Sequence, residues 1–362
     1  MKSDIRWIRL AISVIPMLLF FCGINYYEDP ANLFHNNSKS VAVALLDGKE
    51  AYFGTGNGDE RAVKYYTVER LPKQLDCITL GPSLSMGIRS EDVGTDSYYN
   101  LSVSGMNFID YMGMIAMLET NGVKYDRIIY CVDSYFFDES FATNCRNEDV
   151  LPFTEYMIGL LDGDIAPYPK LKDNDLSFQK KLEQLFSISY FQASMNLVRS
   201  NESFILSEKR WGIIDKTTEN LGHYLCDGSW VYARKYRENT VENVISEADS
   251  YDIKSRFAYD RHVNEYYTYY FRKLIEHLID NNVTVEFFLC PVCPALWDRI
   301  EADNNHFFLL EEIEECAEEI AGDYGIKIIG SFNPYKVGIT NEDYWDARHI
   351  KHEMLSDYFD FK

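Results

Sequence analysis

The sequence predicts an α/β protein in which a mostly parallel sheet carries helices on both faces. Short apolar runs rich in β-branched or aromatic residues alternate with amphipathic stretches, a pattern typical of such sheets. The length of 362 residues fits one large domain or two modest ones. No Gly-x-Gly-x-x-Gly or Gly-x-x-x-x-Gly-Lys follows a predicted strand, which disfavours dinucleotide-binding and P-loop proteins.

The N-terminus predicts a signal anchor or transmembrane helix at residues 1–27. Lys2, Arg6 and Arg9 precede an apolar run from Leu10 to Ile24. No small-x-small cleavage site follows this run, so an uncleaved, single-pass anchor is favoured over a secretory signal. The basic flank then puts the main domain outside the cytoplasm. A buried N-terminal helix of a soluble protein is the alternative.

A stalk and lead-in is expected at 28–69, followed by an α/β domain at 70–362. Its predicted strands are Leu75 to Leu80, Ser97 to Val103, Arg127 to Val132, Val283 to Leu289 and Ile326 to Ile329. Helical spacing of apolar residues predicts helices over 108–118, 266–278 and 309–320, and another from about Lys351.

The region from about 136 to 259 breaks the alternation of strands and helices. It contains an apparent helix near 176–198 and polar, aromatic stretches such as Gly228 to Tyr232. Structureless loops of this length are uncommon, so we expect a large, mainly helical insertion that caps the carboxyl ends of the strands. In parallel sheets the active site lies at those ends.

The charge balance excludes one class of partner. The chain has 57 Asp and Glu against 35 Lys and Arg, a net charge of −22. Such a surface repels phosphate backbones, so we expect no nucleic-acid binding. For a domain outside the membrane, the same charge favours a neutral or cationic glycan over a strongly polyanionic polymer.

Eight cysteines are scattered along the chain, and only Cys290 and Cys293 form a Cys-x-x-Cys motif. We expect this motif to provide two small apolar residues in a loop, or a local disulfide. Redox catalysis and zinc binding are less favoured, because no second Cys or His pair is placed to complete a metal site. The sequence therefore predicts no metal and no cofactor.

Ser83 follows the first predicted strand of the domain, where a nucleophile would be exposed at the sheet edge. A serine hydroxyl needs a neighbouring base, and His349 could supply one. Asp346 precedes His349 by three residues, a spacing that lets its carboxylate reach one ring nitrogen across a turn while the other nitrogen faces Ser83. His352 is a rival base, but its spacing from Asp346 does not suit the same turn.

Three motifs in this order resemble the SGNH (GDSL-like) hydrolase superfamily. They are Gly81-Pro82-Ser83, the block from Asn100 to Gly105, and the block from Asp346 to His349. The chain is more closely similar to the membrane-anchored, extracytoplasmic SGNH-like proteins of envelope-polysaccharide acylation, of the AlgJ/AlgX and DltD kind. The resemblance covers roughly 70–135 and 260–360.

This resemblance implies a flavodoxin-like sheet and assigns roles to the matching residues. Ser83 would be the nucleophile, His349 the base and Asp346 the residue that orients it. The backbone amides of Ser83 and Gly105 would form the oxyanion hole.

Two positions depart from the family pattern. Pro82 stands where the family has Asp or Ser, and Asp133 stands where it has an Asn that donates to the oxyanion hole. An ionised Asp133 would repel an oxyanion, so either Asp133 has another role or the hole consists of Gly105, Ser83 and a cap residue. Further residues expected to line the site are Asp133, Ser134, Asn100 and Trp345.

These observations predict an extracytoplasmic serine esterase or O-acyltransferase acting on a cell-surface polysaccharide, with a glycan or acyl ester as substrate. The alternative, favoured by Asp133, is a non-catalytic SGNH-fold assembly or glycan-binding factor that partners a multi-pass membrane acyltransferase. A thiol oxidoreductase that uses Cys290 and Cys293 is a third, more distant candidate.

Overall fold

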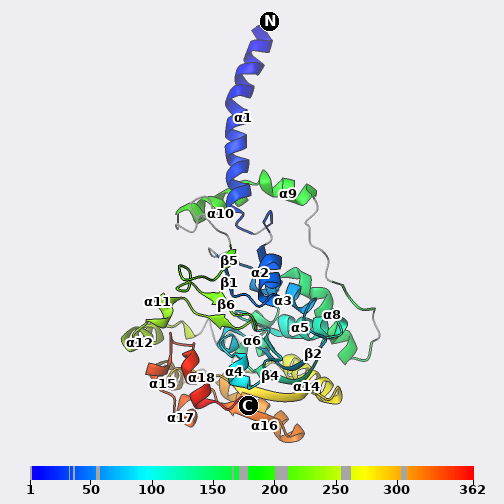
Figure 1. Cartoon of the computed structure of the whole chain (residues 1–362), viewed down its shortest axis with the longest axis vertical. Helices are drawn as coiled ribbons and strands as arrows, with labels where there is room; N and C mark the ends of the chain where they lie inside the picture. The colour runs from blue at the N-terminus through cyan, green and yellow to red at the C-terminus, as the bar shows by residue number, and fades with distance from the viewer. Residues whose placement is uncertain are drawn as a thin grey trace.

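The main sheet has five parallel strands in the order β3-β2-β4-β8-β9 (Figure 1). The strands are β2 (Gln74–Leu80), β3 (Tyr98–Asn100), β4 (Lys124–Cys131), β8 (Thr284–Leu289) and β9 (Lys327–Gly330). The computed structural model describes residues 2–31, 33–35, 37–53, 58–164, 167–170, 178–199, 211–253, 262–302 and 308–362. Numbered among themselves, the strands follow the order 2-1-3-4-5 of doubly wound folds, which confirms the predicted parallel α/β sheet.

Both faces of this sheet are covered, as β8 shows directly. Phe287 packs against Phe271 of α14, with ring centroids 5.4 Å apart. The next residue, Phe288, packs against Phe359 and Phe361 near the C-terminus, each at 5.2 Å. Because successive side chains of a strand point to opposite faces, α14 lies on one face and the C-terminal segment on the other.

The helices that connect or flank these strands are α3 (Glu60–Val68), α4 (Ser90–Val93), α5 (Phe108–Thr120), α14 (Glu265–Asp280), α15 (Pro294–Ala302), α16 (Phe308–Tyr324), α17 (Pro334–Val337) and α18 (His352–Tyr358). The apolar spacing predicts α5, α14, α16 and α18, but it does not predict α3, α4, α15 or α17. The interior of α5 is buried almost throughout. Its Tyr111 stacks on Tyr130 of β4 with ring centroids 4.5 Å apart, and α8 (Leu151–Leu161) covers the helix on its other side.

A second, antiparallel sheet lies beside the first, and the sequence did not predict it. Its strands, in the order β5-β1-β6-β7, are β1 (Ala51–Phe53), β5 (Trp211–Ile213), β6 (His223–Tyr224) and β7 (Trp230–Val231). Thus the lead-in at 28–69 contributes β1, together with α2 (Asn37–Leu46), and the insertion contributes the other three strands. Strands of two or three residues are too short to show an alternating pattern.

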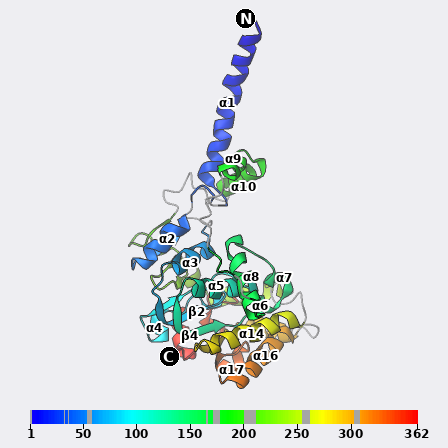
Figure 2. The same ribbon diagram turned by 90° about the vertical axis from the view of Figure 1, so that its right-hand side faces the viewer.

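Within the described residues, the insertion also contributes further helices. Besides α8 it forms α6 (Ser134–Phe137), α7 (Glu139–Ala142), α9 (Phe178–Leu185), α10 (Ile188–Arg199), α11 (Arg234–Arg237) and α12 (Val241–Ser250). Figure 2 shows α9 and α10 at the base of the N-terminal helix, away from the main sheet.

The N-terminal helix α1 (Lys2–Glu28) extends away from the rest of the molecule (Figures 1 and 2). At its base, the ring of Phe21 stacks on Phe191 of α10 with centroids 4.5 Å apart. Asn25 Nδ2 donates a hydrogen bond of 2.9 Å to the carbonyl oxygen of Leu185 in α9. Considering the described residues alone, none of the helices combines the length and apolarity needed to cross a membrane, so the anchor predicted at 1–27 finds no support in them.

Candidate active site

Ser83 begins a short 3₁₀ turn, Ser83–Ser85, directly after β2. The chain reaches this turn through Gly81, which lies against the neighbouring strand. A Cβ atom on Gly81 would lie 2.3 Å from Ser85 Oγ and 2.4 Å from Cys131 Cβ, so a larger residue does not fit. Glycine therefore allows β2 and β4 to end close together beneath the serine.

Ser83, His349 and Asp346 form a continuous chain of hydrogen bonds. His349 Nε2 lies 2.8 Å from Ser83 Oγ, and His349 Nδ1 lies 2.8 Å from Asp346 Oδ2. The imidazole is thus held by a carboxylate on one side and faces a hydroxyl on the other. The rival His352 contacts instead the carbonyl oxygen of Gly87 and the carboxylate of Glu91.

Asp346 is held in place by its own loop. Its Oδ1 accepts hydrogen bonds of 2.8 Å from the backbone amides of Arg348 and His349. Burial alone would raise the pKa of Asp346, but the charge of His349 and these hydrogen bonds lower it to about 2. Asp346 is therefore an ionised carboxylate that can stabilise a protonated imidazole.

Two backbone amides are available near the end of the sheet. Within the described residues, neither the Ser83 amide nor the Gly105 amide donates a hydrogen bond. Gly105 has a φ angle of +57°, which favours glycine. Arg61 holds its peptide, because Nη2 donates to the carbonyl oxygen of Gly105 at 3.2 Å while the guanidinium binds both carboxylate oxygens of Asp110.

Asp133 is not an unpaired carboxylate. Its Oδ2 accepts a hydrogen bond of 3.3 Å from Arg348 Nη2, and its Oδ1 caps α6 by accepting from the amide of Tyr135. Burial acts against the charge of Arg348, but Tyr251 and Asp133 raise its pKa overall, so the guanidinium stays protonated. The charge of Asp133 is thus balanced by a residue of the Asp346–His349 loop.

Two other residues predicted to line the site have structural contacts instead. Asn100 is fully buried, and its Nδ2 donates to the carbonyl oxygens of Ser85 and Ile88 at 2.8 and 2.9 Å. Asn100 therefore stabilises the turn that carries Ser83 through hydrogen bonds from the neighbouring strand β3. Ser134 is also buried, with its hydroxyl 3.3 Å from Asp133 Oδ1.

Tyr232 is a neighbour of the triad that the sequence analysis missed. Its ring centroid lies 5.4 Å from that of His349, and its hydroxyl donates to the carbonyl oxygen of Ser83 at 3.4 Å. The strand before it is docked on the same turn, since the amide of Trp230 donates to the carbonyl oxygen of Met86 at 2.7 Å. The aromatic stretch from Gly228 to Tyr232 was the available signal, but no spacing in the sequence connects it to Ser83.

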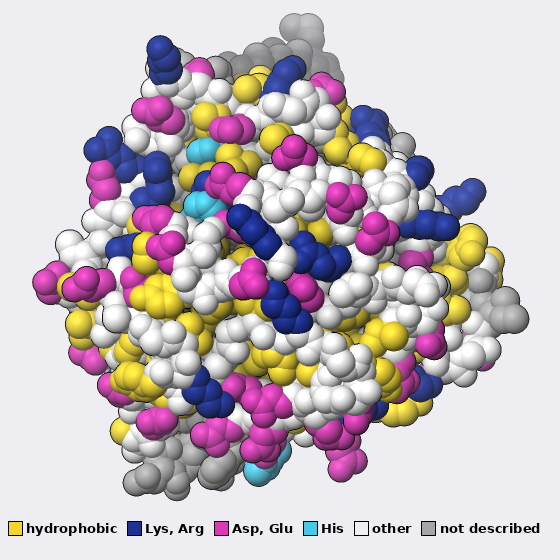
Figure 3. Space-filling view, turned by 60° about the horizontal axis from the view of Figure 1, so that its bottom comes forward, with side chains coloured by type: hydrophobic (Ala, Val, Ile, Leu, Met, Phe, Trp, Pro, Cys, Tyr) yellow, Lys and Arg dark blue, Asp and Glu magenta, His cyan; other side chains and the backbone are white. Residues whose placement is uncertain are grey.

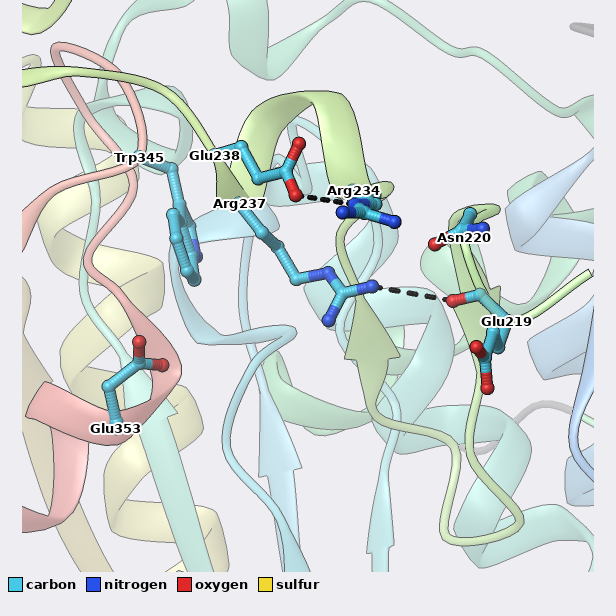
Figure 4. Close-up of a pocket in the computed structure, with 7 residues that line it drawn as sticks. All are labelled: Glu219, Asn220, Arg234, Arg237, Glu238, Trp345 and Glu353. Atoms are coloured by element: carbon cyan, nitrogen blue, oxygen red, sulfur yellow. Dashed lines mark hydrogen bonds and ion pairs between the residues drawn. The ribbon is translucent and has the colours of Figure 1, made fainter. Parts of the chain in front are cut away.

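Trp345, which directly precedes Asp346, lines a pocket (Figure 4). The pocket has a volume of about 530 Å³. The amide of Trp345 donates to the carbonyl oxygen of His349 at 2.7 Å. This hydrogen bond closes the loop of residues 345–349, which contains both the pocket residue Trp345 and the candidate site residues Asp346 and His349.

Cys290 and Cys293 are both free and buried, so they form no disulfide. Burial raises the pKa of Cys290 to about 12 and that of Cys293 to about 11. Because the thiolate is the reactive form, these residues act as small apolar side chains in the loop after β8.

The arrangement can support nucleophilic acyl transfer, since it contains a hydroxyl, a base hydrogen-bonded to it, a carboxylate behind the base, and two free amides. No family model matches the chain, and no curated protein matches it either.

Proposed function

We propose that this protein is a serine esterase or O-acyltransferase and a divergent relative of the SGNH hydrolases. The hydrogen-bonded chain from Ser83 Oγ through His349 to Asp346 carries the proposal. Nucleophile, base and orienting acid in this geometry are the requirement for serine-based acyl transfer.

The reaction begins when Ser83 Oγ attacks the acyl carbon of an ester and transfers its proton to His349 Nε2. The amides of Ser83 and Gly105 donate to the oxyanion of the tetrahedral intermediate. This intermediate collapses as the bond to the leaving alcohol breaks and His349 protonates that alcohol. Water or a sugar hydroxyl then attacks the acyl-serine, gives its proton to His349, and releases Ser83 with its proton restored.

A cell-surface polysaccharide is the proposed substrate. Acidic and basic side chains are interspersed over the face seen in Figure 3, and the chain as a whole carries a net charge of −22. A neutral glycan approaches such a surface without the repulsion that a polyanion would meet.

We also propose that the catalytic domain lies outside the cytoplasm, joined to the membrane through residues 1–27. Support comes from the basic residues that precede the apolar run and from exposed apolar side chains on α1, where Met17, Leu19 and Phe20 are about two-thirds exposed. Alkaline phosphatase fused after residue 53 tests this location. Activity of the fusion in intact cells is expected, and an inactive fusion would contradict the proposal.

A fluorophosphonate probe tests the catalytic proposal. We expect the probe to label the protein, Ser83→Ala and His349→Ala to abolish both labelling and hydrolysis of p-nitrophenyl acetate, and Ser250→Ala and His352→Ala to retain them. The controls are suitable because Ser250 is exposed at the end of α12 and His352 contacts Gly87 and Glu91 rather than Ser83. Labelling that persists in Ser83→Ala would refute the proposed nucleophile.

The same experiment separates the alternative function. A folded wild-type protein that is never labelled but binds glycan or a membrane acyltransferase would act as a non-catalytic assembly factor. Asp133 favoured this alternative in the sequence, and its pairing with Arg348 removes the expected repulsion of an oxyanion.

A further inference from the structure

The pocket beside Trp345 is built from four separate segments. Glu219 and Asn220 come from the loop before β6, Arg234 and Arg237 from α11, Trp345 from the triad loop, and Glu353 from α18 (Figure 4). Its volume of about 530 Å³ is typical of a site for one small ligand or sugar unit.

Hydrogen bonds join these walls into one frame. The amide of Arg234 donates to the carbonyl oxygen of Asn220 at 2.9 Å, which holds the loop against α11. Asn239 Nδ2, just after α11, donates to the carbonyl oxygen of Trp345 at 2.7 Å. The pocket is therefore preformed, so a ligand would not have to order its walls.

The frame connects the pocket to the candidate triad on two sides. Trp345 directly precedes Asp346, and Arg234 lies two residues after Tyr232, whose ring packs against His349. A chain bound in the pocket would thus contact the loop that carries Asp346 and His349. Binding a non-reacting part of the substrate in the pocket would help to hold the reacting group at the triad.

The lining offers both donors and acceptors. In the described part of the chain, the side chain of Arg237 makes one hydrogen bond, from Nη2 to the carbonyl oxygen of Glu219 at 3.3 Å, and no ion pair (Figure 4). Its remaining N–H groups can donate to a ligand. Glu353, on the opposite wall, is exposed and can accept, while the indole of Trp345 adds an apolar surface.

The charges of the lining nearly cancel. The glutamates Glu219, Glu238 and Glu353 and two arginines surround the pocket. Arg234 is already paired with Glu238. A strongly anionic or cationic ligand would therefore meet a like charge close to its partner. Hydroxyl groups both donate and accept, so an uncharged sugar satisfies such a lining without unpaired charge.

We propose that this pocket is the subsite that holds an uncharged sugar residue of the polysaccharide. The inference rests on the proposed function, since it gives that function its substrate class and the place where the polymer binds. Arg237 is a specificity residue here and takes no part in the acyl-transfer chemistry.

Titration calorimetry on the full chain carrying Ser83→Ala, which cannot turn over, tests the subsite. The probes are three neutral pentamers, of β-1,4-linked N-acetylglucosamine, β-1,4-linked glucose and α-1,6-linked mannose, and one anionic pentamer of mannuronate. We expect at least one neutral pentamer to bind, and the mannuronate to bind at least fivefold more weakly. Adding Arg237→Ala should weaken neutral binding at least fivefold, whereas Lys235→Ala, on the same helix but outside the pocket, should leave it unchanged.

The outcomes distinguish the two proposals. With Ser83 intact, hydrolysis of p-nitrophenyl acetate reports on the triad alone, because this small ester does not need the pocket. Loss of sugar binding in Arg237→Ala but not in Lys235→Ala supports the subsite. The subsite is overturned if no neutral pentamer binds, if mannuronate binds more tightly, or if Arg237→Ala and Lys235→Ala have the same effect. Absence of Ser83-dependent hydrolysis would overturn the proposed function, while the calorimetry would still report on the pocket.

Discussion

Asp133 at the end of β4 and Arg348 in the loop before α18 form a buried ion pair, with Oδ2 and Nη2 separated by 3.3 Å. Their side chains are 3% and 11% exposed. The pair joins the carboxyl end of β4, the middle strand of the sheet, to the loop that carries His349. The charge of Asp133 is therefore balanced by the residue that precedes the candidate base His349.

Asp133→Asn should lower both stability and turnover. Asparagine can still cap α6, but it leaves the Arg348 guanidinium buried without its counter-charge, which typically costs about 3–5 kcal/mol. Urea unfolding and hydrolysis of p-nitrophenyl acetate measure the two effects. The double variant Asp133→Asn with Arg348→Met should recover most of the stability. If Asp133→Asn instead raises turnover, residue 133 acts on the oxyanion and the pairing is not its role.

Asp346→Asn should lower kcat about 10⁴-fold while the protein stays folded. The amide oxygen can still accept from the backbone amides of Arg348 and His349, so the loop keeps its shape, but the negative charge beside Nδ1 is lost. Because the pKa of Asp346 is lowered to about 2, the wild type should show no titration of this carboxylate in its pH–rate profile above about pH 4. A loss below tenfold would mean that Asp346 does not act on His349.

The parts of the site that the sequence predicted are those in which chemistry and spacing are local. Ser83 could be found because it follows a strong apolar strand, and Asp346 with His349 because three residues span one turn. The pairing of Asp133 with Arg348 spans 215 residues, and no periodicity connects them. The pair forms because β4 lies next to β2 in the sheet. Asp133, after β4, is thereby close to Ser83, after β2, and to the loop that contacts Ser83 through His349.

The fold shows the same division between local and distant order. The strands of the parallel sheet are short runs of mostly apolar residues, and the second halves of β2 and β4 are buried throughout, which is typical of parallel strands covered on both faces. The small antiparallel sheet depends on β1 meeting strands more than 150 residues away, as in the pairing of Tyr52 with Gly212. Tyr232 and the Trp345 pocket depend on that sheet and on α11, so the sequence could not place them beside the triad.

Arg61→Lys should lower kcat about tenfold and leave KM nearly unchanged. Arg61 binds both carboxylate oxygens of Asp110 and also the carbonyl oxygen of Gly105, and a lysine cannot reproduce this planar, bidentate contact. A displaced Gly105 amide would stabilise the oxyanion less, although removing such a donor outright costs about 10²–10³-fold. The control is Arg272→Lys, an exposed pair with Glu319 and Asp323 that should not alter kcat. A rise in KM alone would place Arg61 in substrate binding instead.

Lys64 should make the stability of the protein depend on pH near neutrality. It is fully buried, and its ammonium donates to the carbonyl oxygens of Asn100 and Gly228, which ties β3 to the β6–β7 hairpin.

Burial lowers the pKa of Lys64 from 10.5 to about 7. Between these values the unfolded chain holds a proton that the native protein has released, so the free energy of unfolding contributed by this residue rises with pH.

Urea unfolding of the wild type and of Lys64→Met at about pH 6.5, 7.5 and 8.5 measures this effect. Lys64→Met should be less stable at each pH, because two buried carbonyl oxygens lose their donor. The difference in free energy of unfolding between the wild type and Lys64→Met should also widen as the pH rises, since only the wild type gains from releasing the Lys64 proton. The cysteine thiols also titrate in this range, but they are the same in both proteins and cancel in the difference. A gap that stays constant or narrows would show that Lys64 keeps its ordinary charge in the native protein, held by the two carbonyl oxygens and by the rings of Tyr99 and Tyr224 at 5.6 and 5.0 Å.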